Sequence, residues 1–187
     1  MKRFTDFKDI YVTYMHTDDY KQGYEQVIKD NPDVKFEYRK EELKYYILKN
    51  LKAKYTSFIC DDAVFIRDVS QKDEEFKLLK DDAVLCLSLR LGENTTIPGD
   101  DGYEIEKPNI VEHTWNWTPL VRMMWTGDGY ASTYESSWGY PMSVSGHVYR
   151  TSDIKPIIEK INFTIPTSLE EGMCKWFMPN RPYMTCY

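Results

Sequence analysis

The order of apolar and polar positions predicts alternating strands and helices in the first half of the chain. Runs rich in β-branched and aromatic residues indicate three strands, at residues 9–17, 34–39 and 55–60. Apolar positions at helical spacing indicate two helices between them, at residues 18–31 and 40–53. A charged helix and a fourth strand are expected next, at residues 71–82 and 83–92. Strands and helices that alternate at this spacing favour an α/β fold with a parallel sheet and crossover helices.

The pattern changes in the second half. Residues 93–140 are rich in Gly, Pro, Thr and Trp and show only fragmentary periodicity, and an irregular segment of this length inside a domain is typically functional. It is followed by a predicted strand and two predicted helices, at residues 141–150, 152–162 and 168–177. Thr167 or Ser168 is expected to cap the last helix. Because no repeat, low-complexity tract or linker interrupts the chain, we expect a single domain over residues 1–187.

The composition narrows the function classes. Of the 187 residues, 42% are apolar and 29% are charged, which allows a folded core and excludes global disorder. The net charge of −6 argues against a nucleic-acid backbone as partner, whereas 15% aromatic residues leave stacking on single strands open. Four scattered cysteines without a CxxC pair indicate reduced thiols, and the chain contains no apolar run of about eighteen residues. We therefore expect a cytoplasmic protein without a membrane span.

One pair of acidic residues stands out by its position. Asp61 and Asp62 directly follow the predicted strand at 55–60, and the apolar residues on both sides, SFIC and AVFI, are expected to bury them. Ligands of open parallel sheets bind outside the carboxyl ends of the strands. Two carboxylates at that edge suit a hard divalent cation, Mn²⁺ or Mg²⁺, whose remaining ligands are usually phosphate oxygens and water. A turn or a helix cap is the alternative explanation for the pair.

The segment YTSFICDDAVFIRD, residues 55–68, resembles the acidic-motif segment of GT-A-fold, nucleotide-sugar-dependent glycosyltransferases. Three further segments follow in the order that bacterial and viral sugar transferases of this type show, namely CLSLRLGEN, WGYPMSVSGHVYRTSDI and FTIPTSLEEGM. The resemblance covers about residues 8–175. Members of the fold begin with a strand and a loop that grip the nucleotide base. The strand at 9–17 resembles their second strand, so the first strand–helix unit is expected to be absent.

This resemblance implies a fold, a substrate class and a cofactor. The fold would be a GT-A-like, Rossmann-like α/β domain with a mostly parallel central sheet, flanking helices and a long aromatic-rich insertion. Asp61 and Asp62 would bind Mn²⁺ or Mg²⁺ together with the diphosphate of a nucleotide sugar, a UDP-sugar first of all. The acceptor would be a hydroxyl group of a carbohydrate or of another molecule.

Charged residues elsewhere fit the same chemistry. Arg90, at the end of the fourth predicted strand, could pair with phosphate oxygens of the donor, and a surface ion pair explains it equally well. An inverting transfer also needs a carboxylate that accepts the proton of the acceptor hydroxyl. Glu170 is the candidate and Glu171 the second choice, because both are expected in the first turn of the last helix. An ordinary capping box is the alternative explanation.

Histidine and aromatic residues complete the candidate site. His147 follows a glycine and is a candidate metal ligand, although a lone histidine beside a strand is more often structural. His16 and Asp18, at the end of the first strand, are candidates for contact with the base or ribose of the donor, and a helix cap explains Asp18 as well. The ring of Trp138 could stack on a sugar or pack beneath the long loop.

The sequence thus predicts a metal-dependent glycosyltransferase of the hexosyltransferase type, with its donor at the Asp61–Asp62 pair and Arg90. The acceptor is expected near three further side chains, Trp138, His147 and Glu170. The alternative is a catalytically inactive nucleotide- or carbohydrate-binding module derived from the same fold. Both interpretations place the ligand at the edge where the strand at 55–60 ends.

Overall fold

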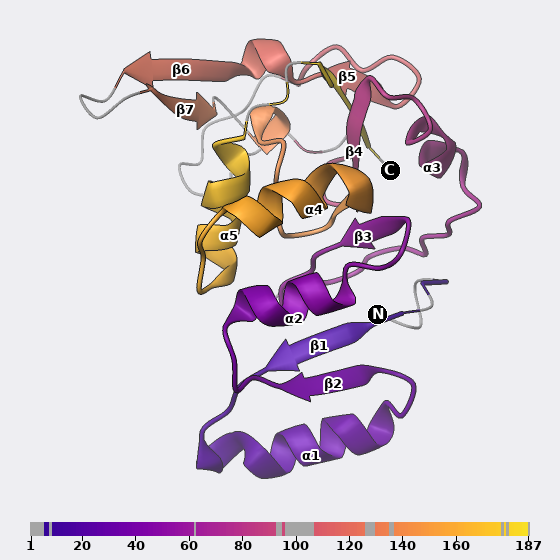
Figure 1. Ribbon diagram of the computed structural model, residues 1–187. Coiled ribbons are helices and arrows are strands. Elements are labelled where there is room, and N and C mark those ends of the chain that lie inside the picture. The colour runs from indigo at the N-terminus through magenta and orange to yellow at the C-terminus, as the bar shows by residue number, and fades with distance from the viewer. Residues whose placement is uncertain are drawn as a thin grey trace.

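Figure 1 shows the computed structural model of the chain, a mixed α/β structure. It describes residues 6–7, 9–61, 63–92, 95, 107–125, 130–134, 137–176, 178 and 180–186, with the backbone alone for 120–125, 130–134 and 137. The strands are β1 (Tyr11–Tyr14), β2 (Lys35–Tyr38), β3 (Tyr55–Ser57), β4 (Val84–Ser88), β5 (Thr114–Asn116), β6 (Val121–Trp125), β7 (Tyr130–Tyr134), β8 (His147–Arg150) and β9 (Tyr183–Cys186). The α-helices are α1 (Lys21–Asp30), α2 (Leu43–Asn50), α3 (Glu74–Leu78), α4 (Thr151–Lys160) and α5 (Pro166–Cys174), and short 3₁₀ turns are η1 (Asp18–Tyr20), η2 (Thr118–Leu120) and η3 (Ser137–Gly139).

The N-terminal part of the molecule is a parallel strand pair with its crossover helix. β1 pairs with β2 in parallel, with Tyr11 opposite Lys35, and α1 connects the two strands. This arrangement confirms the predicted strands at 9–17 and 34–39 and the helix between them. In Figure 1, the arrowheads of β1, β2 and β3 point to the same side of the molecule, so their carboxyl ends face the same way.

The central sheet has five strands in the order β3-β8-β4-β9-β5. β4 and β9 are parallel, whereas β8 runs antiparallel to both of its neighbours and β5 antiparallel to β9. The expectation of a mostly parallel central sheet is therefore wrong, because β8 enters between β3 and β4 from the opposite end. Gly146, whose φ of 84° is rarely adopted by L-residues, lies in the turn that starts β8. As a consequence, β8 begins at the edge of the sheet where β3 and β4 end.

Two apolar clusters cover the two faces of this sheet. Cys86 and Tyr149 alternate along their strands with Leu87 and Val148, so the two pairs point to opposite faces. The first pair belongs to the larger cluster, which also contains Ile154 of α4 and residues of α5. The second pair packs in the smaller cluster with residues of α3. β4 and β8, within the sheet, are thus buried on both faces.

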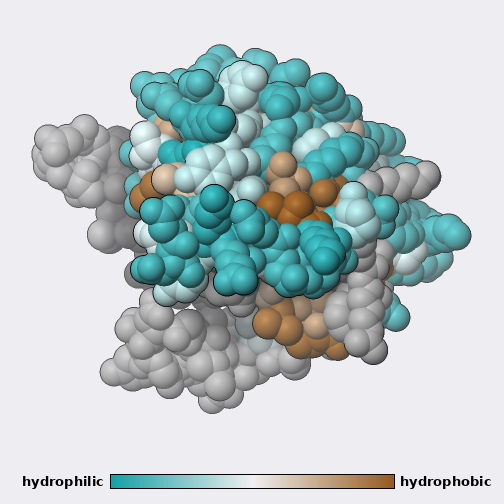
Figure 2. Space-filling view, turned by 90° about the horizontal axis from the view of Figure 1, so that it is seen from below, coloured by the Kyte–Doolittle hydropathy of each residue, from teal (hydrophilic) through white to brown (hydrophobic). Residues whose placement is uncertain are grey.

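The surface is mostly hydrophilic on the face seen from below, with apolar side chains reaching it in places (Figure 2). Two large exposed apolar side chains follow the acidic pair directly: Val64 is 83% and Ile66 is 86% exposed. The apolar run after Asp61 therefore does not bury this acid, which is itself exposed. Within the described parts of the chain, no helix combines the length and apolarity that crossing a membrane requires.

Candidate functional site

The chain segments that lead to two functional candidates come together where β3 and β4 end and β8 begins. The backbone N–H of Gly146 donates a hydrogen bond to the carbonyl of Phe58, just beyond β3, at 2.9 Å. The carbonyl of the same Gly146 accepts a hydrogen bond from Leu89, just beyond β4, at 2.7 Å. Gly146 therefore joins the two chain segments that lead to Asp61 and Arg90. We call this side of the central sheet the carboxyl edge.

A third candidate reaches the same place from α5. The segment 141–146, which we call the rim turn, precedes β8, and the N–H of its Val144 donates to Oε1 of Glu170 at 2.9 Å. The Sγ of Cys60, the residue before Asp61, lies 3.9 Å from the carbonyl oxygen of Val144. The rim turn therefore borders the segments that carry Asp61, Arg90 and Glu170.

The charged groups at this edge are accessible. Asp61 and Arg90 are both exposed. Within the described part of the chain, neither of them forms an ion pair. The positive charge of Arg90 nevertheless contributes to lowering the pKa of His147, so the guanidinium lies near the rim turn and β8. An accessible guanidinium can bind an anion, and an accessible carboxylate can bind a metal ion.

His147 lies beneath the rim turn and not on the surface. Its side chain is fully buried, and burial, together with the charge of Arg90, lowers its pKa to about 3, so the imidazole is neutral near pH 7. Its Nδ1 lies 3.2 Å from the hydroxyl of Tyr149 and 3.7 Å from Sγ of Cys86. Its buried Nε2 has no hydrogen-bond partner among the described residues. The predicted metal ligand is thus separated from solvent in this structure.

Only some of the metal ligands expected from the sequence are among the described residues. Asp62 lies outside the described residues. Among the residues that are described, no three His, Cys, Asp or Glu side chains gather as in a complete metal site. Asp61 is the described residue of the pair, and its exposed carboxylate is of the type that Mg²⁺ and Mn²⁺ prefer.

The position of Glu170 in its helix differs from the expectation. α5 begins at Pro166, and the Ser168 hydroxyl accepts hydrogen bonds from the N–H groups of Ile165 and Thr164, each at 3.2 Å. Neither Thr167 nor Ser168 is the N-cap, because Pro166, whose missing N–H costs nothing at a helix start, begins the helix earlier. Glu170 is consequently in the second turn, and what places it at the rim is its hydrogen bond to Val144 and not the helix dipole.

Trp138 is a core residue in this structure. Its side chain is fully buried, and its ring packs edge to face on Trp115 with centroids 5.0 Å apart. Its Nε1 lies 3.3 Å from the carbonyl oxygen of Thr95, and its own carbonyl accepts a hydrogen bond from Nε1 of Trp115 at 3.0 Å. The ring therefore packs beneath the irregular segment and has no face free for a sugar.

His16 belongs to an aromatic cluster at the carboxyl ends of β1 and β2. The ring of Tyr14 stacks on Tyr24 with centroids 4.8 Å apart, and His16 lies 5.2 Å from Tyr38 and 5.4 Å from Tyr24. Asp18 is exposed in η1, where no side chain caps the turn. Half-buried and exposed rings at the ends of parallel strands form a surface on which a planar group can stack.

Comparisons with known proteins show a distant similarity without assigning the chain to a family. No protein-family model matches the chain, and no solved structure matches it significantly. Over 165 residues, covering 85% of this chain, the sequence is 25% identical to Bifunctional glycosyltransferase pgtA of Dictyostelium discoideum. The chain spans about a fifth (21%) of the length of that relative. The similarity indicates a distant relationship to a glycosyltransferase.

Sequence reasoning missed two features of the site. Tyr149, whose hydroxyl lies beneath the rim turn, reads in the sequence as an ordinary strand residue. The second feature is the aromatic cluster. Three of its rings belong to predicted elements of the N-terminal part: Tyr14 and Tyr38 to strands, and Tyr24 to the helix between them. The position of Tyr14 and Tyr38 at strand ends is the signal that could have found them.

Proposed function

We propose that this protein transfers a sugar from a nucleoside-diphosphate donor to a hydroxyl acceptor with the help of Mn²⁺ or Mg²⁺. The observation that carries the proposal is that the rim turn bonds to Glu170 and also contacts Cys60 and Leu89, the chain neighbours of Asp61 and Arg90. The distant similarity to a glycosyltransferase supports the transfer of a sugar, and the donor and metal are inferred from the chemistry of these residues.

Asp61, together with Asp62, is the proposed cation site. The fit rests on the exposed carboxylate of Asp61, which offers oxygen atoms to a hard ion without competition from a described ion pair. A bound divalent cation would neutralise charge that develops on the departing diphosphate. Buried His147 is assigned no contact with this ion, because its nitrogen does not reach the surface where the carboxylate lies.

Arg90 and Glu170 take the two remaining roles. The guanidinium of Arg90 binds diphosphate oxygens, for which its planar set of donors is suited. Glu170 accepts the proton of the acceptor hydroxyl: one of its carboxylate oxygens takes the N–H of Val144, which fixes the group, while the other has no partner among the described residues. Glu171 is its exposed neighbour and the second choice. His16, Asp18 and the aromatic cluster would receive the nucleoside.

A second candidate function is a catalytically inactive nucleotide- or carbohydrate-binding module. The hydrogen bond between Val144 and Glu170 favours it, because a carboxylate that holds a backbone turn has a structural use without any chemistry. In that case the carboxyl edge would bind ligands with the same metal dependence and release them unchanged.

Calorimetry followed by a transfer assay separates these candidates. Titration of the protein with a panel of UDP-sugars, with and without Mn²⁺, should show binding that requires the metal. An assay of sugar release and transfer should then show turnover. Metal-linked binding without turnover would favour the inactive module, and the absence of any metal-linked binding would reject both.

Glu170→Gln tests the assigned proton acceptor. The amide oxygen can still accept the N–H of Val144, so the fold and donor affinity should stay unchanged, while transfer should fall about 10²- to 10⁴-fold. The matched control is Glu171→Gln, an exposed neighbour that should retain activity. A weaker donor affinity in Glu170→Gln, or loss of transfer in the control instead, would show that the role is misassigned.

A further inference from the structure

The rim turn bonds to Glu170 directly and to the chain segments that lead to Asp61 and Arg90. Its Gly146 bonds to the ends of β3 and β4, and its Val144 bonds to Glu170. A shift of this turn would therefore change the positions of Asp61, Arg90 and Glu170 relative to one another. What holds the turn in place determines the geometry of the proposed site.

The hydroxyl of Tyr149 supports the rim turn from the side of the core. It donates a hydrogen bond to the carbonyl of Ser143 at 2.7 Å and lies 3.3 Å from that of Pro141. The ring is fully buried in the main core, where Tyr149 pairs with Thr56 of β3 and Cys86 of β4. Burial raises the pKa of this phenol, so it stays a donor at any ordinary pH.

His147 completes this support. Because the single hydroxyl proton of Tyr149 goes to Ser143, the contact of 3.2 Å between its oxygen and Nδ1 of His147 requires that the imidazole donate. A neutral imidazole with its proton on Nδ1 leaves Nε2 unprotonated, which agrees with its lack of a hydrogen-bond partner among the described residues. Loss of the hydroxyl would therefore leave the buried carbonyl of Ser143 without this donor and remove one acceptor of the imidazole N–H.

We propose that Tyr149 is a positioning residue that sets the separation of Asp61, Arg90 and Glu170 by fixing the rim turn. The proposal rests on the proposed function for its catalytic consequence, and on the contacts alone for its structural one. Tyr149 touches neither substrate nor metal, and it acts through Ser143 and the turn.

The test of the structural part is Tyr149→Phe, followed by amide hydrogen exchange at Val144 and Gly146. Exchange at these amides should become about fivefold faster or more, the change expected for a net hydrogen bond of about 1 kcal/mol. The matched control is Tyr46→Phe: Tyr46 is also buried, and its hydroxyl bonds to the backbone of Lys40 and Tyr38 at 2.9 and 3.2 Å, away from the rim turn. Unchanged exchange in Tyr149→Phe, or equal acceleration in the control, would overturn the proposal.

The test of the functional part compares kcat and KM in the same two variants. Tyr149→Phe should lower kcat about tenfold with a smaller change in KM for the donor, because the reacting groups are displaced and the accessible charges remain. Tyr46→Phe should leave kcat unchanged, even at equal loss of thermal stability. If the wild type transfers sugar and Tyr149→Phe keeps its kcat, the functional part is rejected. If the wild type shows no transfer, the proposed function fails while the exchange experiment still decides the structural part.

A second variant moves the rim turn from its other end. Gly146 has a φ of 84°, which strains any residue with a Cβ, and a Cβ added there would lie 3.7 Å from that of Arg90. Gly146→Ala should accelerate exchange at Val144 and lower kcat as Tyr149→Phe does. Unaltered exchange and kcat in Gly146→Ala would show that the turn does not set the geometry of the site.

Discussion

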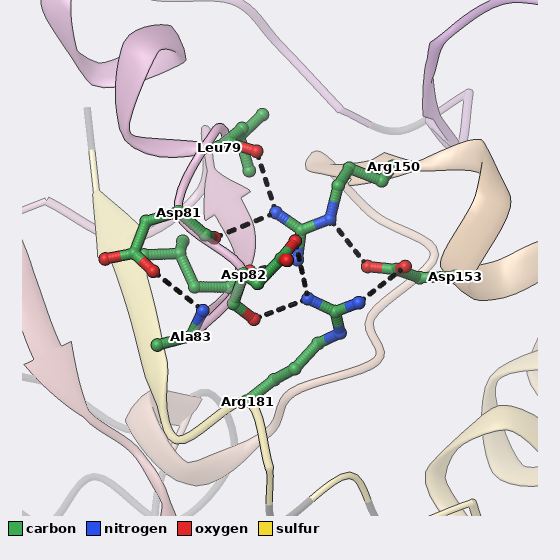
Figure 3. A network of polar contacts seen from close by, with 8 residues as sticks. Leu79, Asp81, Asp82, Ala83, Arg150, Asp153 and Arg181 are labelled. Atoms are coloured by element: carbon green, nitrogen blue, oxygen red, sulfur yellow. Dashed lines mark hydrogen bonds and ion pairs between the residues drawn. The ribbon is translucent and has the colours of Figure 1, made fainter.

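The charged side chains at the two edges of the central sheet differ in whether they have partners. At the amino ends of β4 and β9, which we call the amino edge, a closed network is formed by Arg150, Asp153 and Arg181 (Figure 3). The guanidinium of Arg150 donates to the carbonyl groups of Leu79 at 2.7 Å and Asp81 at 3.1 Å, as well as to that of Val84. At the carboxyl edge, Asp61 and Arg90 are exposed and form no ion pair within the described part of the chain.

In the network at the amino edge, both carboxylate oxygens of Asp153 have a hydrogen-bond partner. One of its oxygens accepts Nε of Arg150 at 2.7 Å, and the other accepts a guanidinium N–H of Arg181 at 3.0 Å. Buried charges persist in proteins when every donor and acceptor is used in this way. Arg150, Asp153 and Arg181 thus use their charges on one another and on the backbone, whereas Asp61 and Arg90 keep exposed charges that are available for a ligand.

Arg150→Ala should break the closed network and give the largest change in stability. It would leave the Asp153 carboxylate and several buried carbonyl groups without their donor, so the free energy of unfolding should fall by about 3–5 kcal/mol. Urea denaturation measures this loss. The control is Lys35→Ala, which removes an exposed ion pair with Asp9 at 2.7 Å and should cost less than about 1 kcal/mol. Equal losses in the two variants would show that the amino edge is no more structural than the surface.

His147 predicts a pH dependence that separates the buried layer from the edge above it. Its pKa is about 3 in the folded state and near 6.5 when unfolded, so the unfolded chain binds the additional proton between these values. Stability should therefore be complete above pH 6.5 and fall as the pH drops towards 3. Between pH 7 and pH 5, the loss from this residue should be about 2 kcal/mol.

His147→Gln supplies the comparison for this pH dependence. Gln carries an N–H that can replace the donor facing Tyr149, and it does not titrate. Urea denaturation at pH 7 and pH 5 should show a smaller loss of stability in the variant than in the wild type. The same pH dependence in both proteins would mean that His147 is protonated in the fold or accessible to water.

Local pattern was sufficient to predict the elements before residue 93 but not β5, β6, β7 and β9, and it did not predict the strand directions. The strands at 55–60 and 83–92 and the helix at 152–162 appear as β3, β4 and α4, because their periodicity is carried by neighbouring residues. The antiparallel entry of β8 depends on pairing between His147 and Ser88, which are far apart in the sequence. The apolar pattern of a strand does not show whether the strand runs parallel or antiparallel to its neighbours.

The candidate site shows the same limit. The placement of Asp61 and Arg90 beyond the ends of β3 and β4 could be predicted, because each directly follows an apolar run with strand pattern. The burial of Trp138 and His147 could not, since an aromatic ring that packs in a core and one that stacks on a ligand look alike in sequence. Arg150 and Asp153 are close in the sequence, but Arg181, which completes their network, comes from the segment before β9.

Asp61→Asn gives the sharpest test of the carboxyl edge, with little effect on the fold. Because this carboxylate is exposed and forms no ion pair with a described residue, the free energy of unfolding should change by less than about 0.5 kcal/mol. Metal-dependent affinity for a UDP-sugar should fall about tenfold or more, since an amide oxygen is a weaker ligand for a hard cation than a carboxylate.

The matched control is Asp82→Asn, in an adjacent acidic pair at the amino edge. Asp82 is also largely exposed, and its carboxylate lies 3.6 Å from Arg181, so its loss should be small in stability and absent in metal-linked binding. Calorimetry with Mn²⁺ and a UDP-sugar measures the binding of both variants. If Asp61→Asn unfolds the protein, its carboxylate has a structural role like that of Asp153. If both variants bind as the wild type does, the acidic pair at the carboxyl edge holds no metal, and the difference between the two edges concerns stability alone.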